Sequence, residues 1–308
     1  MMMSLRSVFV RFCKKNLTLN PSFTSMSRKM SSLGNYKFNT LAVSQPTNFV
    51  YQVELNRPEK RNAMNRLFWK EFTECFDTIA HDPDCRVVIL SGAGKAFTAG
   101  LDIMDHSELL IRDEDVDIGR AAFQIRKTVA ELQKTFLSIE NCPKPVIATI
   151  HGACVGGGID MISACDMRYC TSDAWFQIKE IDLGIAADLG TLQWMPKIVG
   201  SHSWVRELAL TARKFLPDEA KEFGFVSRIF GDREEMIKEA MTVAETIASK
   251  SPVAVQGTKI NLNNSRDKSV KEGLDSMVLW NTSMLQSEDV MKSAMAAMQK
   301  ETPVFSKL

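Results

Sequence analysis

The chain has 308 residues, of which 45% are hydrophobic and 24% are charged, a composition typical of an ordinary globular protein. No apolar run approaches the roughly 20 residues that a membrane-spanning helix needs, so we expect no membrane span. The seven cysteines form no C-x-x-C pair, which indicates reduced thiols rather than a disulfide scaffold or a zinc ribbon.

Charge is distributed unevenly along the chain. Residues 1–53 contain seven Lys and Arg and no Asp or Glu, which leaves 31 of the 38 basic residues against all 37 acidic ones in the remainder. The remainder therefore carries a net charge of −6. An acidic body has no electrostatic reason to bind nucleic acid, so we expect no nucleic-acid partner.

Both ends of the sequence resemble targeting signals. Residues 1–35 are basic, free of acids and rich in serine, which predicts a mitochondrial transit peptide that is removed or lacks fixed structure; a compositional bias without function is the alternative. The last three residues, Ser306-Lys307-Leu308, match the tripeptide that the peroxisomal import receptor reads. We therefore expect the protein in both mitochondria and peroxisomes, with that receptor as a partner.

The hydrophobic pattern predicts an α/β fold with a helical C-terminal third. In chain order we expect strands at 36–43 and 49–55, a helix at 62–81, a strand at 86–90, a helix at 116–140, a strand at 145–150, helices at 201–212 and 217–223, a strand at 225–230, and helices at 233–249, 252–264, 268–284 and 287–299. The repeated order of strand, glycine turn and helix indicates crossover connections. We divide the chain into a leader (1–35), a core (36–230), a helical region of the same domain (231–300) and a tail (301–308).

Two glycine-rich segments follow predicted strands, but neither is a nucleotide-binding motif. Gly94-Lys95 is followed by Ala96 instead of Ser or Thr, and a dinucleotide fingerprint beginning at Gly156 would require glycine where Met161 stands. Such glycines can instead present backbone N–H groups, and two N–H groups that converge on one oxygen form an oxyanion hole for a carbonyl that becomes an enolate. A simple requirement for tight turns is the alternative.

Three acidic residues stand in apolar stretches. Asp160 follows the triple glycine, while Glu180 and Asp188 flank L-G-I-A-A (183–187). Apolar surroundings raise the pKa of a carboxyl group, which suits proton transfer near neutral pH. Paired acids also serve glycoside hydrolysis and metal binding, or simply cap helices and form ion pairs, and the residues alone leave these alternatives open. The four scattered histidines form no cluster with acids, and no G-x-S-x-G motif supports a serine nucleophile.

The chain contains A-F-T-A-G-L-D-I (96–103), P-K-P-V-I-A-T-I-H-G-A-C-V-G-G-G-I-D (143–160) and W-F-Q-I-K-E-I-D-L-G-I (175–185). These segments resemble the enoyl-CoA hydratase/isomerase, or crotonase, family, and the resemblance runs from about residue 36 to 300. Three further segments, 162–170, 186–193 and 249–262, resemble the branch that converts 3,5-dienoyl-CoA to 2,4-dienoyl-CoA in the oxidation of unsaturated fatty acids. The resemblance implies a crotonase-like spiral of ββα turns and a homo-trimer or homo-hexamer.

The resemblance also implies a site for an acyl-CoA substrate. Glu180 would remove a proton from carbon 2, Asp188 would protonate carbon 6, and Asp160 would tune and position the other two acids; the order of Glu180 and Asp188 stays open. The oxyanion N–H groups would belong to Leu101 and Gly157. The implied substrate-binding residues are Ala99, Gly100, Leu101, Asp102, Ile103 and Gly157.

No metal and no cofactor beyond the CoA thioester of the substrate is implied. An enoyl-CoA hydratase or a delta(3)-delta(2)-enoyl-CoA isomerase is the nearest alternative. Family members that resemble RNA binders offer an alternative of another class, which the acidic body and the lack of a basic, aromatic stripe disfavour.

Overall fold

Short apolar segments build a six-stranded sheet in this computed structural model, which describes residues 33–106 and 116–308. In sheet order the strands are β1 (Leu41–Thr47), β2 (Val50–Leu55), β3 (Val87–Gly92), β4 (Val146–Ile150), β6 (Met167–Thr171) and β8 (Arg228–Phe230). β1 and β2 are antiparallel, and the other neighbouring strands are parallel. Parallel strands are covered on both faces, which is why β3 and β4 are buried along their whole length.

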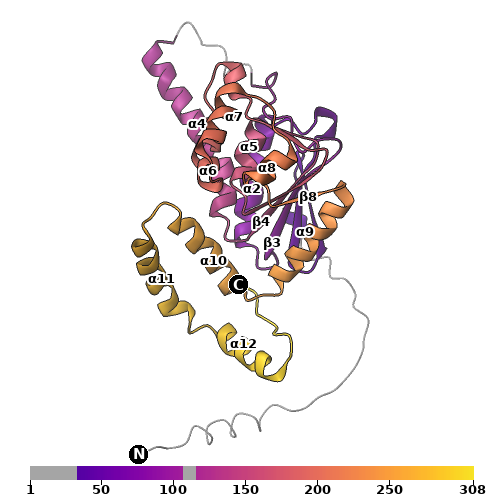
Figure 1. The fold of residues 1–308 in the computed structure, drawn as a ribbon, viewed down its shortest axis with the longest axis vertical. Coiled ribbons are helices and arrows are strands. Elements are labelled where there is room, and N and C mark those ends of the chain that lie inside the picture. Colours follow the sequence, from indigo (N-terminus) through magenta and orange to yellow (C-terminus); the bar gives the residue numbers. More distant parts are fainter. Residues whose placement is uncertain (1–32, 107–115) are drawn as a thin grey trace, which may run out of the picture. The chain divides into compact units, whose positions relative to one another are not determined.

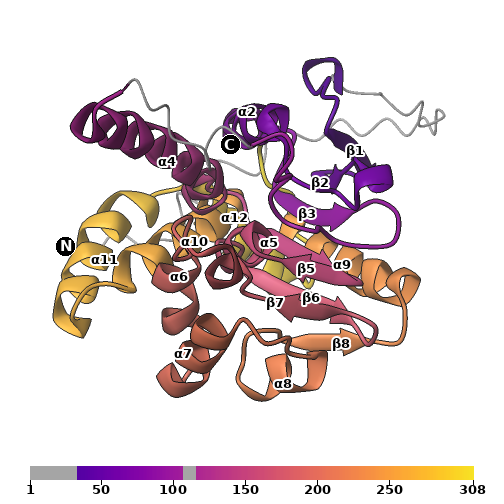
Figure 2. The same ribbon diagram turned by 90° about the horizontal axis from the view of Figure 1, so that it is seen from above.

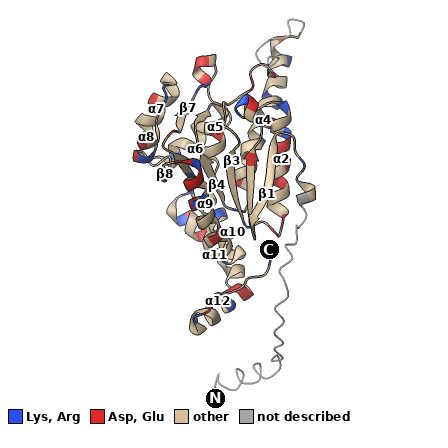
Figure 3. Ribbon diagram, turned by 90° about the vertical axis from the view of Figure 1, so that its right-hand side faces the viewer, with Lys and Arg blue, Asp and Glu red and all other residues tan. Residues whose placement is uncertain are grey.

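Helices follow the strands and dominate the C-terminal part of the chain (Figures 1 and 2). The α-helices are α2 (Arg66–His81), α4 (Ile118–Asn141), α5 (Gly157–Ser163), α6 (Thr191–Ile198), α7 (His202–Thr211), α8 (Pro217–Glu222), α9 (Arg233–Ala248), α10 (Pro252–Ser265), α11 (Val270–Met284) and α12 (Glu288–Gln299). Short 3-10 helices are η1 (Leu33–Asn35), η2 (Pro58–Lys60) and η3 (Glu180–Leu183). Figure 3 shows that Lys, Arg, Asp and Glu gather on the helices, whereas β3 and β4 carry none.

One face of the sheet is covered by α9, whose inner residues are small. Ala240, Ala244 and Ala248 recur every four residues and pack, fully or nearly fully buried, against side chains of β2, β3 and β4. Small side chains on one stripe of a helix allow its backbone to approach the sheet closely. Elsewhere in the fold, α2 and α4 contact each other through aromatic rings, with Trp69 and Phe136 5.5 Å apart.

A second, two-stranded parallel sheet carries the triple-glycine segment. It pairs β5 (Ala153–Val155) with β7 (Trp175–Gln177). Single bridges join Thr98 to Cys154 and Met64 to Leu101. The loops that follow β2 and β3 are thereby tied to the strand that leads into α5, which brings the predicted site segments together.

Two predicted boundaries were wrong, and side-chain hydrogen bonds explain both. The first strand begins at Leu41 instead of 36, because the buried Glu71 carboxylate accepts the backbone N–H groups of Asn39 and Thr40 before the strand starts. The first long helix begins at Arg66 instead of 62, where the Asn65 side chain accepts the N–H of Phe68 and caps the helix.

Other elements were shortened or missed. The strand predicted at 225–230 covers only Arg228–Phe230. The prediction lacked β5, β6, β7 and α6, because three to five residues are too few to show a period and because α6 contains Pro196. The α/β order and the helical C-terminal third are confirmed. The predicted leader lies almost entirely outside the described residues.

Candidate active site

A mostly apolar cavity of about 340 Å³ lies between α2, α4, the loop after β3 and the loop after β7. From α4 it receives Ile125, Thr128, Val129 and Leu132. Seven of the nine predicted site residues line it: Ala99, Gly100, Leu101, Ile103, Gly157, Glu180 and Asp188. The other two, Asp102 and Asp160, lie outside the lining and support it from behind.

The backbone on both sides of Leu101 is hydrogen-bonded, whereas the Leu101 N–H group is available. The N–H groups of Ala99 and Gly100 donate to the Arg61 carbonyl (2.9 Å) and the Thr98 hydroxyl (3.1 Å). The N–H of Asp102 donates to the Met64 carbonyl at 3.0 Å. Among the described residues the Leu101 N–H has no acceptor, so it can donate to a ligand in the cavity.

Glycine is required beside this amide. Gly100 has φ of +86°, and a Cβ atom on it would lie 2.7 Å from the Val155 carbonyl oxygen. Its own carbonyl accepts the N–H of Met64 at 2.8 Å, so both peptide groups that flank the residue are fixed. Close approach of two backbone segments therefore aims the Leu101 amide.

The second predicted amide stands at the beginning of α5. Gly156 adopts φ of +54° and donates its N–H to the Gln177 carbonyl at 2.9 Å, and Gly157 is the first helical residue. A first-turn N–H has no partner within its helix, and in the described part of the chain the Gly157 N–H has none outside it. Two available N–H groups therefore line the same cavity.

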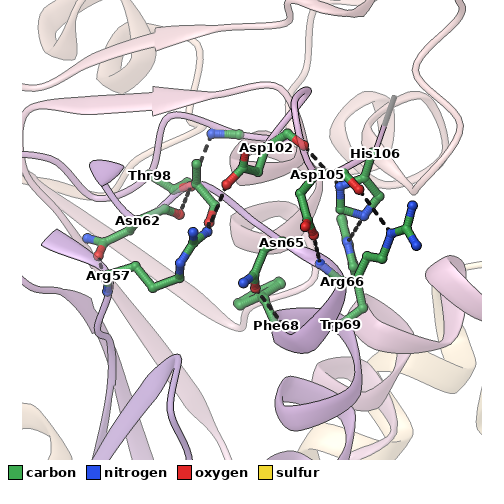
Figure 4. Close-up of polar contacts among 12 residues, drawn as sticks. Arg57, Asn62, Asn65, Arg66, Phe68, Trp69, Thr98, Asp102, Asp105 and His106 are labelled. Atoms are coloured by element: carbon green, nitrogen blue, oxygen red, sulfur yellow. Dashed lines mark hydrogen bonds and ion pairs between the residues drawn. The ribbon is translucent and has the colours of Figure 1, made fainter. Parts of the chain in front are cut away.

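Polar contacts hold the segment 98–106 against the start of α2 (Figure 4). The Asp102 carboxylate pairs with Arg57 at 3.1 Å, and the Asp105 carboxylate accepts the Arg66 N–H at 2.7 Å. His106 is buried and bonded to Trp69 at 3.0 Å. Asp102, predicted to bind substrate, is thus engaged in an ion pair that braces this segment.

Glu180 is the buried acid of the cavity. It begins η3, is 9% exposed, and one of its carboxylate oxygens, Oε2, has no hydrogen-bond partner among the described residues. Burial raises the pKa of Glu180, and the charge of Asp188 raises it further. Its Oε1 lies 3.4 Å from where a Cβ of Gly156 would stand, which places the carboxyl beside the glycine turn.

Asp188 is exposed, on the loop that leads into α6. Partial burial raises the pKa of its carboxyl group. Its carbonyl accepts a hydrogen bond of 2.7 Å from the Gln133 side chain on α4. The cavity therefore has two acids with raised pKa values, one buried and one open to water.

Asp160 lies behind this loop. It is fully buried, and its Oδ1 accepts the N–H of Thr191, the first residue of α6, at 2.6 Å. Burial, followed by the neighbouring Glu180 charge, raises the pKa of Asp160 to about 7. Asp160 thus anchors the residue three positions after Asp188.

Residues from three helices that contribute to the cavity or brace it were not predicted. Trp69 and the α4 residues line it, Gln133 braces Asp188, and Thr191 holds Asp160. The pattern of 62–81 and 116–140 predicted two helices, but not what those helices contact.

A family model described as enoyl-CoA hydratase/isomerase matches residues 45–307. The chain belongs to the enoyl-CoA hydratase/isomerase family. Members of this family act on acyl-CoA thioesters, and the predicted crotonase-like fold is confirmed. A solved enoyl-CoA hydratase from Bacillus anthracis superposes with a TM-score of 0.78 at 28% identity, covering 87% of this chain and 99% of that one.

Within the enoyl-CoA hydratase/isomerase family, relatives of higher identity carry a narrower name. A rat protein named mitochondrial delta(3,5)-delta(2,4)-dienoyl-CoA isomerase is 52% identical over 295 residues, which cover 94% of this chain and 90% of the relative. An Arabidopsis thaliana protein named peroxisomal delta(3,5)-delta(2,4)-dienoyl-CoA isomerase is 45% identical, covering 90% of this chain and all of the relative. Both exceed the 28% identity of the Bacillus anthracis hydratase.

Two negative observations concern the described residues only. No group of three or more His, Cys, Asp or Glu side chains in this part is arranged to hold a metal ion. None of its helices combines the length and the apolar character of a membrane span.

Proposed function

We propose that this chain isomerises 3,5-dienoyl-CoA to 2,4-dienoyl-CoA in the oxidation of unsaturated fatty acids. The observation that carries the proposal is one cavity lined both by Leu101 and Gly157, whose N–H groups are available, and by two acids with raised pKa values. The names of the rat and Arabidopsis relatives support the same reaction.

The first step removes a proton from carbon 2. Glu180 takes this proton, the electron pair of the broken C–H bond enters the conjugated chain, and negative charge spreads to the thioester oxygen and to carbon 6. The Leu101 and Gly157 N–H groups donate to that oxygen. Donors that are already oriented stabilise such charge without reorganisation, and losing one typically costs about 10²–10³ in rate.

The second step adds a proton at carbon 6. Asp188 supplies it, which leaves the double bonds at positions 2 and 4 and reverses the protonation of the two acids. Two separate acids are needed because carbons 2 and 6 are four bonds apart. Asp160 positions Asp188 through Thr191, and its own buried carboxyl interacts electrostatically with Glu180. The proposal includes no metal and no cofactor other than the CoA of the substrate.

A homo-trimer or homo-hexamer is part of the proposal. On α11 the side chains of Val270, Leu274 and Val278, spaced four residues apart, are 62–81% exposed in the single chain. An exposed apolar stripe is typical of a subunit contact. Light scattering of the purified protein tests the predicted mass.

Localisation in mitochondria and peroxisomes agrees with the compartments in the names of the rat and Arabidopsis relatives. The peroxisomal import receptor is the proposed partner of Ser306-Lys307-Leu308. In the fold, the Ser306 hydroxyl donates to Glu288 at 3.0 Å and Lys307 pairs with Asp84, so binding to the receptor would require these contacts to open.

The alternative is hydration of a simple enoyl-CoA, the activity in the name of the Bacillus anthracis relative, or a delta(3)-delta(2) shift. Purified protein is assayed with 3,5-octadienoyl-CoA, with crotonyl-CoA and with a 3-enoyl-CoA. The proposal expects formation of the conjugated 2,4-diene to exceed both other rates. Faster loss of the crotonyl chromophore would establish a hydratase instead.

A further inference from the structure

Among the described residues, Trp69 supplies the one indole ring in the lining of the cavity, and neighbouring side chains fix its position. The residue is 7% exposed and makes edge contacts with Phe68 at 5.4 Å and Phe136 at 5.5 Å. The Phe136 ring in turn lies 3.9 Å from where a Cβ of Gly157 would stand. The indole therefore forms the cavity wall on the side of the oxyanion amides, where the first carbons of an acyl chain would lie.

One hydrogen bond fixes the orientation of this ring. The indole Nε1–H only donates, so the Nε2 of His106, 3.0 Å away, is the acceptor and carries no proton. The proton of His106 is then on Nδ1, which donates to the Asp102 carbonyl at 3.1 Å. Figure 4 shows this chain of contacts from α2 to the loop.

The same contacts connect the wall to the oxyanion hole. Asp102 directly follows Leu101, and its N–H is bonded to Met64. Rotation of the indole would break the bond to His106, which is one of several contacts that hold the loop on which the Leu101 amide stands. The indole and the loop that carries the oxyanion amide are thus joined by one chain of hydrogen bonds.

We propose that Trp69, held by His106, limits the width of the acyl site beside the first carbons and thereby rejects acyl chains that are branched there. The proposal rests on the proposed function for the class of ligand, an acyl-CoA thioester. Trp69 acts by contact with the chain, and His106 is a positioning residue that acts through Trp69.

The test compares octanoyl-CoA with 4-methyloctanoyl-CoA by calorimetry, and the corresponding 3,5-dienoyl thioesters by turnover. A methyl group at carbon 4 adds width without altering carbon 2 or carbon 6. One misplaced methylene-sized group in an apolar pocket costs about 10–200-fold, so the natural chain should prefer the straight thioester by at least about tenfold. Trp69→Phe should reduce that preference about tenfold.

A matched control is available on α7. Trp204 is likewise buried, stacks on Phe223 at 4.6 Å and donates its Nε1–H to Glu219 at 2.7 Å, away from the cavity. Trp204→Phe should leave the preference unchanged. Equal weakening of both thioesters in Trp69→Phe, with the preference intact, would overturn the proposal, and so would a natural chain that does not discriminate.

Two variants of His106 test the positioning role. His106→Leu removes both hydrogen bonds and should reduce the preference as Trp69→Phe does. His106→Gln offers one acceptor and one donor and should restore it; identical preferences in the two variants would overturn the role of His106. Binding is measured with saturated thioesters that cannot isomerise, so a failed isomerase assay would leave this readout intact and would count only against the proposed function.

Discussion

The two segments that supply the site are built in opposite ways. In the oxyanion segment, residues 98–106, the N–H groups on both sides of Leu101 are bonded, and Asp102 and His106 are tied to other elements. In the acid segment, residues 180–191, all six residues from 181 to 186 are exposed, and few contacts hold the segment.

The contrast follows from what each segment has to do. A donor that stabilises developing charge is effective only if its direction is fixed before the reaction. An acid that exchanges protons needs a pKa near the working pH and a route to water, which an exposed Asp188 has and the buried Glu180 shares through the cavity. The amides are thus held rigidly, whereas the acids have access to water.

The largest effect is expected in the acid segment. Glu180→Gln keeps the shape of the side chain but cannot accept a proton, so turnover should fall by about 10²–10⁴ in a steady-state assay. Glu222→Gln, on the exposed side of α8, is the matched control and should be fully active. Near-normal turnover of Glu180→Gln would remove this residue from the mechanism.

A substitution at Gly100 disturbs the oxyanion segment most directly. Gly100→Ala would force a Cβ against the Val155 carbonyl and displace the Leu101 amide, so kcat/KM should fall by about 10²–10³. Gly224→Ala has a similar φ of +79° but open space around it, so it shares the backbone strain without the clash. If both variants retained activity alike, the fixed direction of the amide would not matter.

Asp160 shares a property with each segment, because it is held rigidly like the amides and is ionisable like the acids. The pKa of Asp160 is raised to about 7 in the fold, whereas in the unfolded chain it is about 4. The fold therefore gains the full stabilisation from this group below pH ~4 and loses it as the pH rises through 7. Asp160→Asn does not titrate. Between pH 4 and pH 8 its free energy of unfolding should therefore rise by roughly 1–4 kcal/mol relative to that of the natural chain. Urea unfolding at both pH values measures this, and a constant difference would contradict the account.

The smallest effect is expected at Gln133. Gln133→Leu removes the hydrogen bond to the Asp188 carbonyl, whose worth of about 0.5–1.5 kcal/mol corresponds to a two- to tenfold loss of kcat. Gln124→Leu, earlier on the exposed side of α4, is the control. A loss of a hundredfold or more would show that the acid segment is held more rigidly than its contacts indicate.

The contrast also separates what sequence can and cannot predict. Acids in apolar stretches are a local signal, and they located Glu180 and Asp188, whereas the resemblance supplied Gly100 and Gly157; all four line the cavity. Family resemblance was needed to choose among the reactions that such residues permit. The boundaries of β1 and α2 escaped because the Glu71 and Asn65 side chains compete with the backbone there.

The residues that support the site from other helices could not be predicted from the sequence, for another reason. Trp69, Gln133 and Thr191 stand in ordinary helical patterns, and their roles arise from which helix lies beside which loop. The ion pair of the Asp102 carboxylate with Arg57 joins residues 45 positions apart, and no local pattern indicates it; the role of Asp102 in substrate binding stays a prediction.

Proton exchange at carbon 2 in Asp188→Asn tests the central claim, that two acids act at two different carbons, most directly. The variant is incubated with 3,5-octadienoyl-CoA in deuterated water, and deuterium in the unreacted substrate is followed alongside formation of the 2,4-diene. We predict that deuterium enters carbon 2 faster than the diene forms, because Glu180 still removes that proton while carbon 6 lacks its donor. Exchange that disappears while isomerisation persists would contradict the account and reverse the roles of the two acids.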